Sequence, residues 1–203
     1  MSLIEELTER LRKGSRHARI ALGAECGARV YPIYDEYWVG DFYESVRRSV
    51  DLVWSYASGS TIDEADSRAC IQEVKKILDF YGDEEISILL QTVSVILYAL
   101  EALTEDDAAS TLAVARSLAV ARDVAQSAEA MANEGVPRGS RTQWAAAWEE
   151  DWQNRALAVI DGWKGLARRD MFDVLDDKPP KWLLDWKARR RPDGALRRAR
   201  PGR

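Results

Sequence analysis

Helix-start signals recur along this chain, and they constrain its fold more than any other feature. Ser2-Leu3-Ile4-Glu5 forms a capping box, in which the serine hydroxyl accepts from first-turn N–H groups and the glutamate reaches back. Thr61-Ile62-Asp63-Glu64 has the same form, and Thr104-Glu105-Asp106-Asp107 places carboxylates at the favourable end of a helix dipole. No segment shows the sustained alternation of apolar and polar residues that predicts a strand. The pattern predicts an all-α protein, a multi-helix bundle of about seven to eight helices.

Glycine and proline residues set the expected helix ends. Pro32 should stop the second helix at Tyr31, because proline lacks an N–H group and disfavours the helical conformation before it. The aromatic segment from Tyr31 to Val39 is then expected to be a loop or a helical turn, and Asp41 to cap the next helix. Gly135 to Gly139 is expected to be a loop. The expected helices cover residues 3–14, 15–31, 42–58, 61–82, 83–103 and 104–135.

Two of these helices should form the centre of the bundle. The apolar run from Ile86 to Leu103 is interrupted by polar side chains, so it predicts a buried helix and no membrane span. The following segment, from Thr104 to Gly135, is rich in alanine and nearly free of β-branched residues. Small side chains let a neighbouring helix approach closely, which favours a tightly packed central position.

A tryptophan-rich stretch, "TQWAAAWEEDWQNRALAVIDGW", runs from Thr142 to Trp163. At about 100° per residue, one stripe of a helix collects the large apolar side chains. These are Trp144, Trp148, Trp152, Val159, Trp163 and Leu166. Glu149, Glu150 and Asp161 should face solvent, with Asp151 at the margin of the stripe. We interpret the stripe as a packing face; a ligand-stacking platform is the alternative, and a metal site is disfavoured because the acids diverge.

The C-terminal part of the chain differs in composition from the rest. Residues 1–178 are expected to form a single helical-bundle domain, followed over 179–190 by an amphipathic helix that packs on it through Trp182 and Leu183. Residues 191–203 are expected to be a basic, disordered tail. Anchoring of this region to a partner or a membrane surface, and tail contact with nucleic acid, are the alternatives.

Charge is distributed unevenly along the 203 residues. Residues 181–203 hold nine basic and two acidic side chains, a net charge of +7, which leaves 20 − 32 = −12 for residues 1–180. An acidic body disfavours nucleic acid and anionic membranes and favours cationic partners. Cys26 and Cys70 make no disulfide framework, and no secretory signal is visible, so the expected location is the cytoplasm.

Several kinds of catalytic chemistry lack their residues in this sequence. His17 is the single histidine, which excludes HExxH zinc sites and paired Glu-x-x-His di-iron motifs. His17 lies in a basic patch, Arg16 to Arg19, and is expected at the surface. P-loop, GxGxxG and GxSxG motifs do not occur. We therefore expect no catalytic residues, no cofactor and no metal; most acidic pairs begin helices, where capping explains them.

The stretch "RHARIALGAECGARVYPIYDEYWVGD", followed by "SVRRSVDLVWSYASG", resembles helical immunity proteins of bacterial polymorphic-toxin systems. The corresponding residues are Ala21, Ala24, Cys26, Val30, Pro32, Tyr34, Asp35, Asp41, Trp54 and Gly59. Residues 29–34 are also similar to the Arg-x-Tyr-Pro-x-Tyr motif of an uncharacterised all-helical bacterial family. The immunity pattern has an Arg-Pro pair where this chain has Asp41-Phe42-Tyr43-Glu44. The resemblance covers about a quarter of the chain and implies a helical fold and a toxin-blocking role.

Together these features favour a non-catalytic protein that neutralises a cognate toxin by occluding it. Complementary charge between an acidic blocker and a basic toxin domain speeds encounter and sets specificity. The candidate partner-binding residues are the acids at two consecutive helix starts, Asp83, Glu84, Glu85, Asp106 and Asp107. Two alternatives stay open: a helical scaffold or homodimer formed through the tryptophan stripe or the alanine-rich helix, and a metal-dependent hydrolase that uses carboxylates.

Overall fold

The computed structural model describes residues 1–37, 43–81, 87–134, 144–175 and 180–189, and everything below concerns these ranges. Within them the chain forms eight α-helices and a short 3-10 helix, with no strand, which confirms the all-α bundle. The helices are α1 (Leu3–Leu11), α2 (Arg16–Tyr37), α3 (Tyr43–Ala57), α4 (Glu64–Tyr81), α5 (Ser87–Thr104), α6 (Asp107–Ala132), α7 (Ala145–Ile160) and α8 (Lys181–Arg189), and the 3-10 helix is η2 (Asp173–Leu175).

Of the helix starts predicted at Ser2, at Thr61 and within Thr104 to Asp107, two are confirmed. Ser2 and Glu5 form both hydrogen bonds of the capping box of α1. Asp106 caps α6 by accepting from the N–H of Ala109 at 2.9 Å. The capping box predicted from Thr61 is wrong: α4 begins at Glu64, and Asp63 is the cap, because its carboxylate accepts from the N–H of Ala65 at 2.8 Å.

The predicted end of α2 at Tyr31 is also wrong, because Pro32 lies inside the helix, which continues to Tyr37. The proline removes one backbone bond, the one that would run to the carbonyl of Ala28. Val30 and Ile33 on either side are completely buried, so the packing of this part of α2 outweighs the local break. The predicted cap Asp41 and the predicted loop from Gly135 to Gly139 lie outside the described residues.

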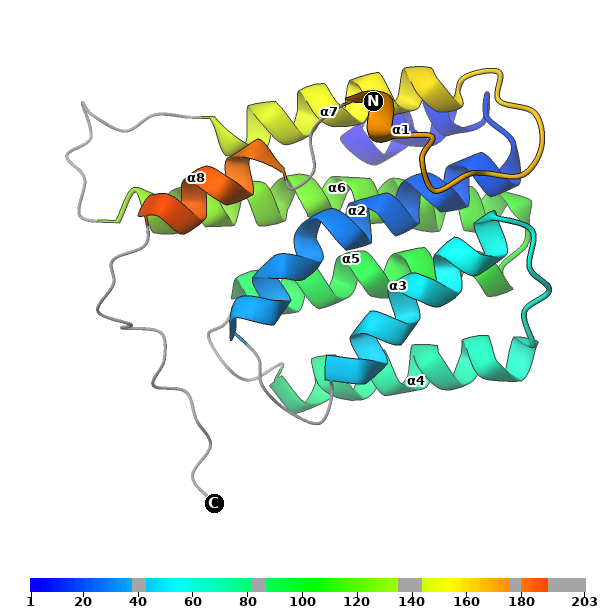
Figure 1. The fold of residues 1–203 in the computed structure, drawn as a ribbon, viewed down its shortest axis with the longest axis horizontal. Coiled ribbons are helices and arrows are strands. Elements are labelled where there is room, and N and C mark those ends of the chain that lie inside the picture. Colours follow the sequence, from blue (N-terminus) through cyan, green and yellow to red (C-terminus); the bar gives the residue numbers. More distant parts are fainter. Residues whose placement is uncertain (38–42, 82–86, 135–143, 176–179, 190–203) are drawn as a thin grey trace.

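Figure 1 shows the arrangement of the helices. The long helices α5 and α6 run antiparallel and pack extensively on each other, and α2 packs against both. On one side of this central group lie α3 and α4, with α4 at the edge of the bundle; on the other side lie α1, α7 and α8. The predicted central positions of the apolar and the alanine-rich helices are therefore observed.

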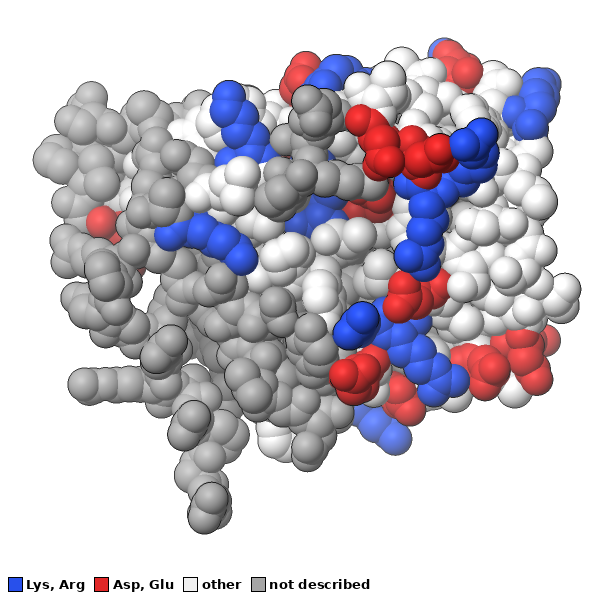
Figure 2. Space-filling model, in the orientation of Figure 1, with Lys and Arg blue, Asp and Glu red and all other residues white. Residues whose placement is uncertain are grey.

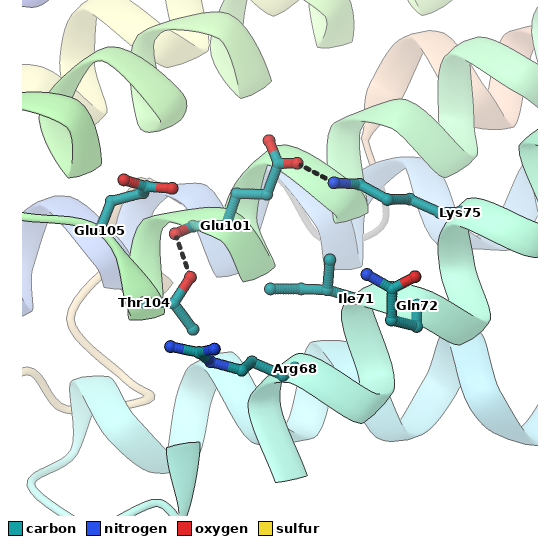
Figure 3. Close-up of a pocket in the computed structure, with 7 residues that line it drawn as sticks. All are labelled: Arg68, Ile71, Gln72, Lys75, Glu101, Thr104 and Glu105. Atoms are coloured by element: carbon teal, nitrogen blue, oxygen red, sulfur yellow. Dashed lines mark hydrogen bonds and ion pairs between the residues drawn. The ribbon is translucent and has the colours of Figure 1, made fainter. Parts of the chain in front are cut away.

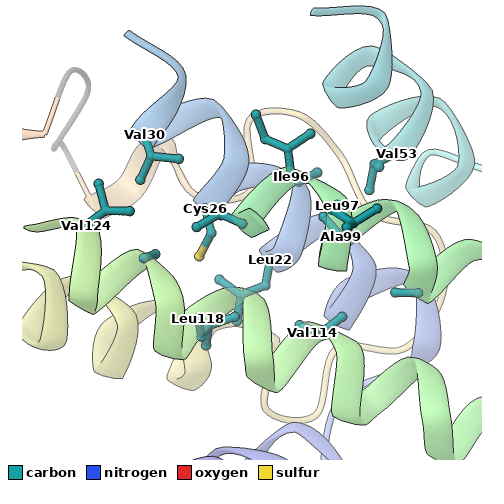
Figure 4. Packing of buried hydrophobic residues seen from close by; sticks show 14 of the residues in the cluster. Leu22, Cys26, Val30, Val53, Ile96, Leu97, Ala99, Val114, Leu118 and Val124 are labelled. Carbon is teal, nitrogen blue, oxygen red and sulfur yellow. The ribbon is translucent and has the colours of Figure 1, made fainter. Parts of the chain in front are cut away.

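Figure 4 shows buried side chains between the central helices, and small residues among the core explain how closely these helices approach. A Cβ atom placed on Gly23 of α2 would meet Ala99 of α5 at 3.5 Å and Val114 of α6 at 3.6 Å. Alanines of α6 such as Ala121 are completely buried. The Ser117 hydroxyl donates to the backbone carbonyl of Val95 at 3.0 Å, which satisfies a polar group at the α5–α6 contact.

The tryptophan stripe packs largely as predicted. Trp144 and Trp152 are buried, and Trp148 and Trp163 are half-buried. Leu166 is 53% exposed, because α7 ends at Ile160 and the stripe does not continue as helix beyond it. In α8, Trp182 and Leu183 are completely buried against the body, where α8 contacts α6 and α7.

Among the described helices, none is both long enough and apolar enough to span a bilayer. This agrees with the interrupted apolar pattern of α5, where the hydroxyls of Thr92 and Ser94 donate to backbone carbonyls one turn earlier in the helix.

Candidate functional site

The predicted partner-binding acids do not form one patch in the described structure. Asp83, Glu84 and Glu85 lie outside the described residues. The described starts of α5 and α6 lie at opposite ends of α5, about 26 Å apart at 1.5 Å per residue. An acidic surface at the start of α6 must therefore be completed by other elements.

Asp106 and Asp107 both stabilise the fold. Asp106 is the N-cap of α6. Asp107 pairs with Arg19 of α2, whose side chain is only 6% exposed whereas that of Asp107 is 69% exposed. Each carboxylate thus has an internal partner on one side and remains open to solvent on the other.

The basic patch expected at the surface, Arg16 to Arg19, connects α2 to the α5–α6 junction. The Arg16 guanidinium donates to the backbone carbonyls of Ala102, Leu103 and Glu105, the last at 2.7 Å, and so satisfies carbonyl groups at the end of α5. Arg19 is buried, and His17 is half-buried and stacks on Tyr56 with ring centroids 5.3 Å apart. The patch is therefore largely an internal clamp.

A groove opens between α4 and α5 at the same end of the bundle. We call it the α4–α5 groove; its volume is about 310 Å³, and it is lined by Arg68, Ile71, Gln72, Lys75, Glu101, Thr104 and Glu105 (Figure 3). Lys75 and Glu101 form an ion pair across it at 3.0 Å. Glu105 lies directly after α5 and immediately precedes Asp106, so the lining of the groove ends next to the acidic start of α6.

The groove was not predicted from the sequence, because its lining residues come from two separate segments of the chain. Arg68, Gln72 and Lys75 are spaced i, i+4, i+7 on α4, whereas Glu101 lies in the last turn of α5 and Glu105 directly after that helix. Polar residues at such positions are typical of a solvated surface. Only the packing of α4 along α5 shows that the two faces meet.

The interior holds an ionic cluster that the sequence prediction placed in solvent. Glu149 of α7 was expected to face water, but its side chain is 0% exposed. Its carboxylate accepts from Arg29 of α2 at 2.9 Å and from the indole N–H of Trp182 of α8 at 2.9 Å. Gln153 donates to the other carboxylate oxygen at 3.3 Å, and the Arg29 guanidinium lies 3.9 Å from the centroid of the Trp152 ring. Glu150 and Asp161 are exposed, as predicted.

Arg122 extends this cluster to the surface. Its side chain donates to the amide oxygen of Gln153 at 2.7 Å and to Glu150 at 3.2 Å. Because each of these groups has a partner, the cluster satisfies its own charges and connects α2, α6, α7 and α8.

Cys26 lies in the same region and is free, as is Cys70. Burial, with a further contribution from the Glu149 carboxylate, raises the pKa of the Cys26 thiol well above its ordinary value. Burial also raises the pKa of Cys70. Both thiols are therefore protonated at neutral pH, and a protonated thiol is a poor nucleophile.

Across the described ranges, no group of three or more His, Cys, Asp or Glu residues is arranged to hold a metal ion. The chain matches no protein-family model, no curated protein and no solved structure.

Proposed function

We propose that this protein is a non-catalytic, immunity-type binding protein of the cytoplasm, which neutralises a basic toxin domain by occluding it. The observation that carries the proposal is the α4–α5 groove, an open, charged surface that continues into the acidic start of α6. Its lining reaches Glu105, which directly precedes two of the predicted partner-binding acids, Asp106 and Asp107.

Charge supports a cationic partner. Residues 1–180 carry a net charge of −12. A toxin that acts on nucleic acid needs positive charge to bind phosphates, so an acidic blocker is attracted to the surface that the substrate would occupy. On the face shown in Figure 2, acidic and basic side chains lie next to one another, which favours a patterned contact over a uniform field.

The interior also bears on the choice between this proposal and a homodimeric scaffold. The two surfaces expected to form a dimer, the tryptophan stripe and the alanine-rich helix, are largely covered within the single chain, as buried Trp152 and Ala121 illustrate. A dimer would have to use another surface. The α4–α5 groove, by contrast, is open in the single chain.

Co-expression tests the proposal. The reading frame next to the gene is expressed with and without this protein, and growth is measured; we expect the neighbour to be toxic alone and harmless with this protein. A catalytically inactive form of that toxin should co-elute with this protein in size-exclusion chromatography with light scattering. Persistent toxicity, with separate elution of the two proteins, would contradict the proposal.

A further inference from the structure

We infer that the α4–α5 groove receives a lysine- or arginine-bearing segment of the partner protein, and that the incoming cation replaces Lys75 as the partner of Glu101. This inference rests on the proposed function and specifies the chemistry of its contact. The observation behind it is the lining of the groove, whose apolar, polar and acidic side chains can each contact a different part of such a segment.

The apolar part of the lining suits the stem of a basic side chain. Ile71 is 6% exposed and lines the groove together with Thr104, whose side chain carries a methyl group (Figure 3). Lysine and arginine bury their methylene groups on such surfaces while the charged head stays at a polar rim. Gln72, exposed on α4, supplies donors for backbone carbonyls of an extended segment, and so do the remaining N–H groups of Arg68, which also pairs with Glu64 one turn earlier.

The acidic part of the lining suits the charged head. Glu101 and Glu105 both line this small groove, and like charges that lie close together repel each other. Both lie in the last turn of α5 or just beyond it, where the helix dipole favours cations. The backbone of Glu105 is held by Arg16, so the position of this residue is fixed before any partner arrives. A cation between the two carboxylates removes the repulsion.

The resident ion pair can be exchanged at little cost. Lys75 and Glu101 retain 45% and 25% side-chain exposure, so solvent screens their attraction. Lys75 reaches Glu101 from the α4 side, whereas Glu105 extends from the α5 end (Figure 3). A basic side chain that enters between them therefore meets the carboxylate of Glu105 and a Glu101 carboxylate that is only loosely paired with Lys75.

The test measures binding to the purified, catalytically inactive toxin domain encoded by the neighbouring gene, by isothermal titration calorimetry. The double variant Glu101→Gln/Glu105→Gln should weaken binding at least about tenfold. Its matched control, Glu9→Gln/Asp151→Asn, removes the same charge from exposed positions on α1 and α7 and should change affinity by less than about threefold. Circular dichroism verifies that each variant is folded.

A second pair of variants isolates the exchange. Lys75→Met removes the resident cation, and Lys76→Met makes the same charge change at the adjacent exposed position. The Kd of the Lys75→Met variant should be about threefold lower than that of the Lys76→Met variant. If wild type binds but the glutamate double variant matches its control, the groove is not the contact, and the proposed function still stands. Equal effects of the two lysine variants overturn the exchange. If wild type does not bind at all, both the proposed function and this inference are wrong.

Discussion

The substitution Glu149→Leu tests whether the buried ionic cluster holds the bundle together. Glu149 and Arg29 have side chains that are 0% and 1% exposed, so the substitution removes the Glu149 carboxylate from a buried ion pair. Removing one partner of a buried ion pair destabilises proteins by about 3–5 kcal/mol. The indole N–H of Trp182 loses its acceptor as well, so we expect a value toward the upper end of that range.

For a chain of this length, the entropy of unfolding is about 0.4 kcal/mol per kelvin, so this loss corresponds to a decrease in Tm of about 7–12 °C. The measurement is urea unfolding followed by circular dichroism, with thermal scans as a second probe. Glu150→Leu is the matched control, because Glu150 is the adjacent acid and its side chain is 56% exposed; we expect a change below about 1 kcal/mol.

A double-mutant cycle separates the ion pair from simple packing. Arg29→Met with Glu149→Leu replaces both charges by apolar groups, and such replacements are often nearly neutral, so the double variant should be more stable than either single variant. The reasoning is refuted if Glu149→Leu unfolds within about 1 kcal/mol of wild type, or if the two substitutions are additive.

Three further predictions concern α7, α8 and Cys26. Trp182→Ala should destabilise the protein by about 3–5 kcal/mol and expose α8 to limited proteolysis, whereas Leu184→Ala, at a half-exposed position, should do neither. Glu129→Ala should cost about 1–2 kcal/mol in urea unfolding, because the carboxylate accepts from the N–H of the N-cap Trp144 at 2.7 Å and from the N–H of Ala145, the first residue of α7, at 2.8 Å; Glu129→Gln, which keeps an acceptor, should cost less. Because the pKa of the Cys26 thiol is raised in the folded protein, the unfolded chain releases this proton first, near its pKa of about 8.5. The contribution of the thiol to the free energy of unfolding is therefore complete below that pH and is lost as the pH rises toward the pKa of the folded state. The urea midpoint of wild type should therefore fall more between pH 7 and pH 10 than that of Cys26→Ala, and equal falls would contradict the assignment.

Local signals were sufficient for much of the fold. The cap at Ser2 and a cap within Thr104 to Asp107 were predicted because a cap depends on groups within four residues of each other, and the structure shows that Asp106 is the second of these caps. The same reasoning was wrong at Thr61, where Asp63 offered a second acceptor close by and the sequence does not decide between them. It was also wrong at Pro32, because the burial of Val30 and Ile33 is a tertiary effect that local propensity does not include.

Glu149 shows why helical periodicity misplaced a residue of the interior. It lies next to Trp148 and away from the apolar stripe, so the angular argument assigned it to solvent. It is buried because Arg29 of α2 and Trp182 of α8, 120 and 33 residues away in sequence, converge on its carboxylate. A single sequence gives no sign that these three residues meet, since each is unremarkable within its own helix.

The α4–α5 groove also brings together residues that are far apart in sequence, but its carboxylates are held less firmly than the buried Glu149. Inside the bundle, Glu149 meets a cation and two further donors, so its position is fixed and its loss should affect folding. At the groove, Glu101 forms a solvent-exposed ion pair with Lys75, and Glu105 is bound through its backbone carbonyl. Replacing the two carboxylates should therefore leave the free energy of unfolding nearly unchanged. Substitutions at the two places should therefore act on different quantities: stability for the buried cluster and partner affinity for the groove. A groove substitution that unfolded the protein would show that these carboxylates belong to the fold, and the argument for a binding surface would then have no support.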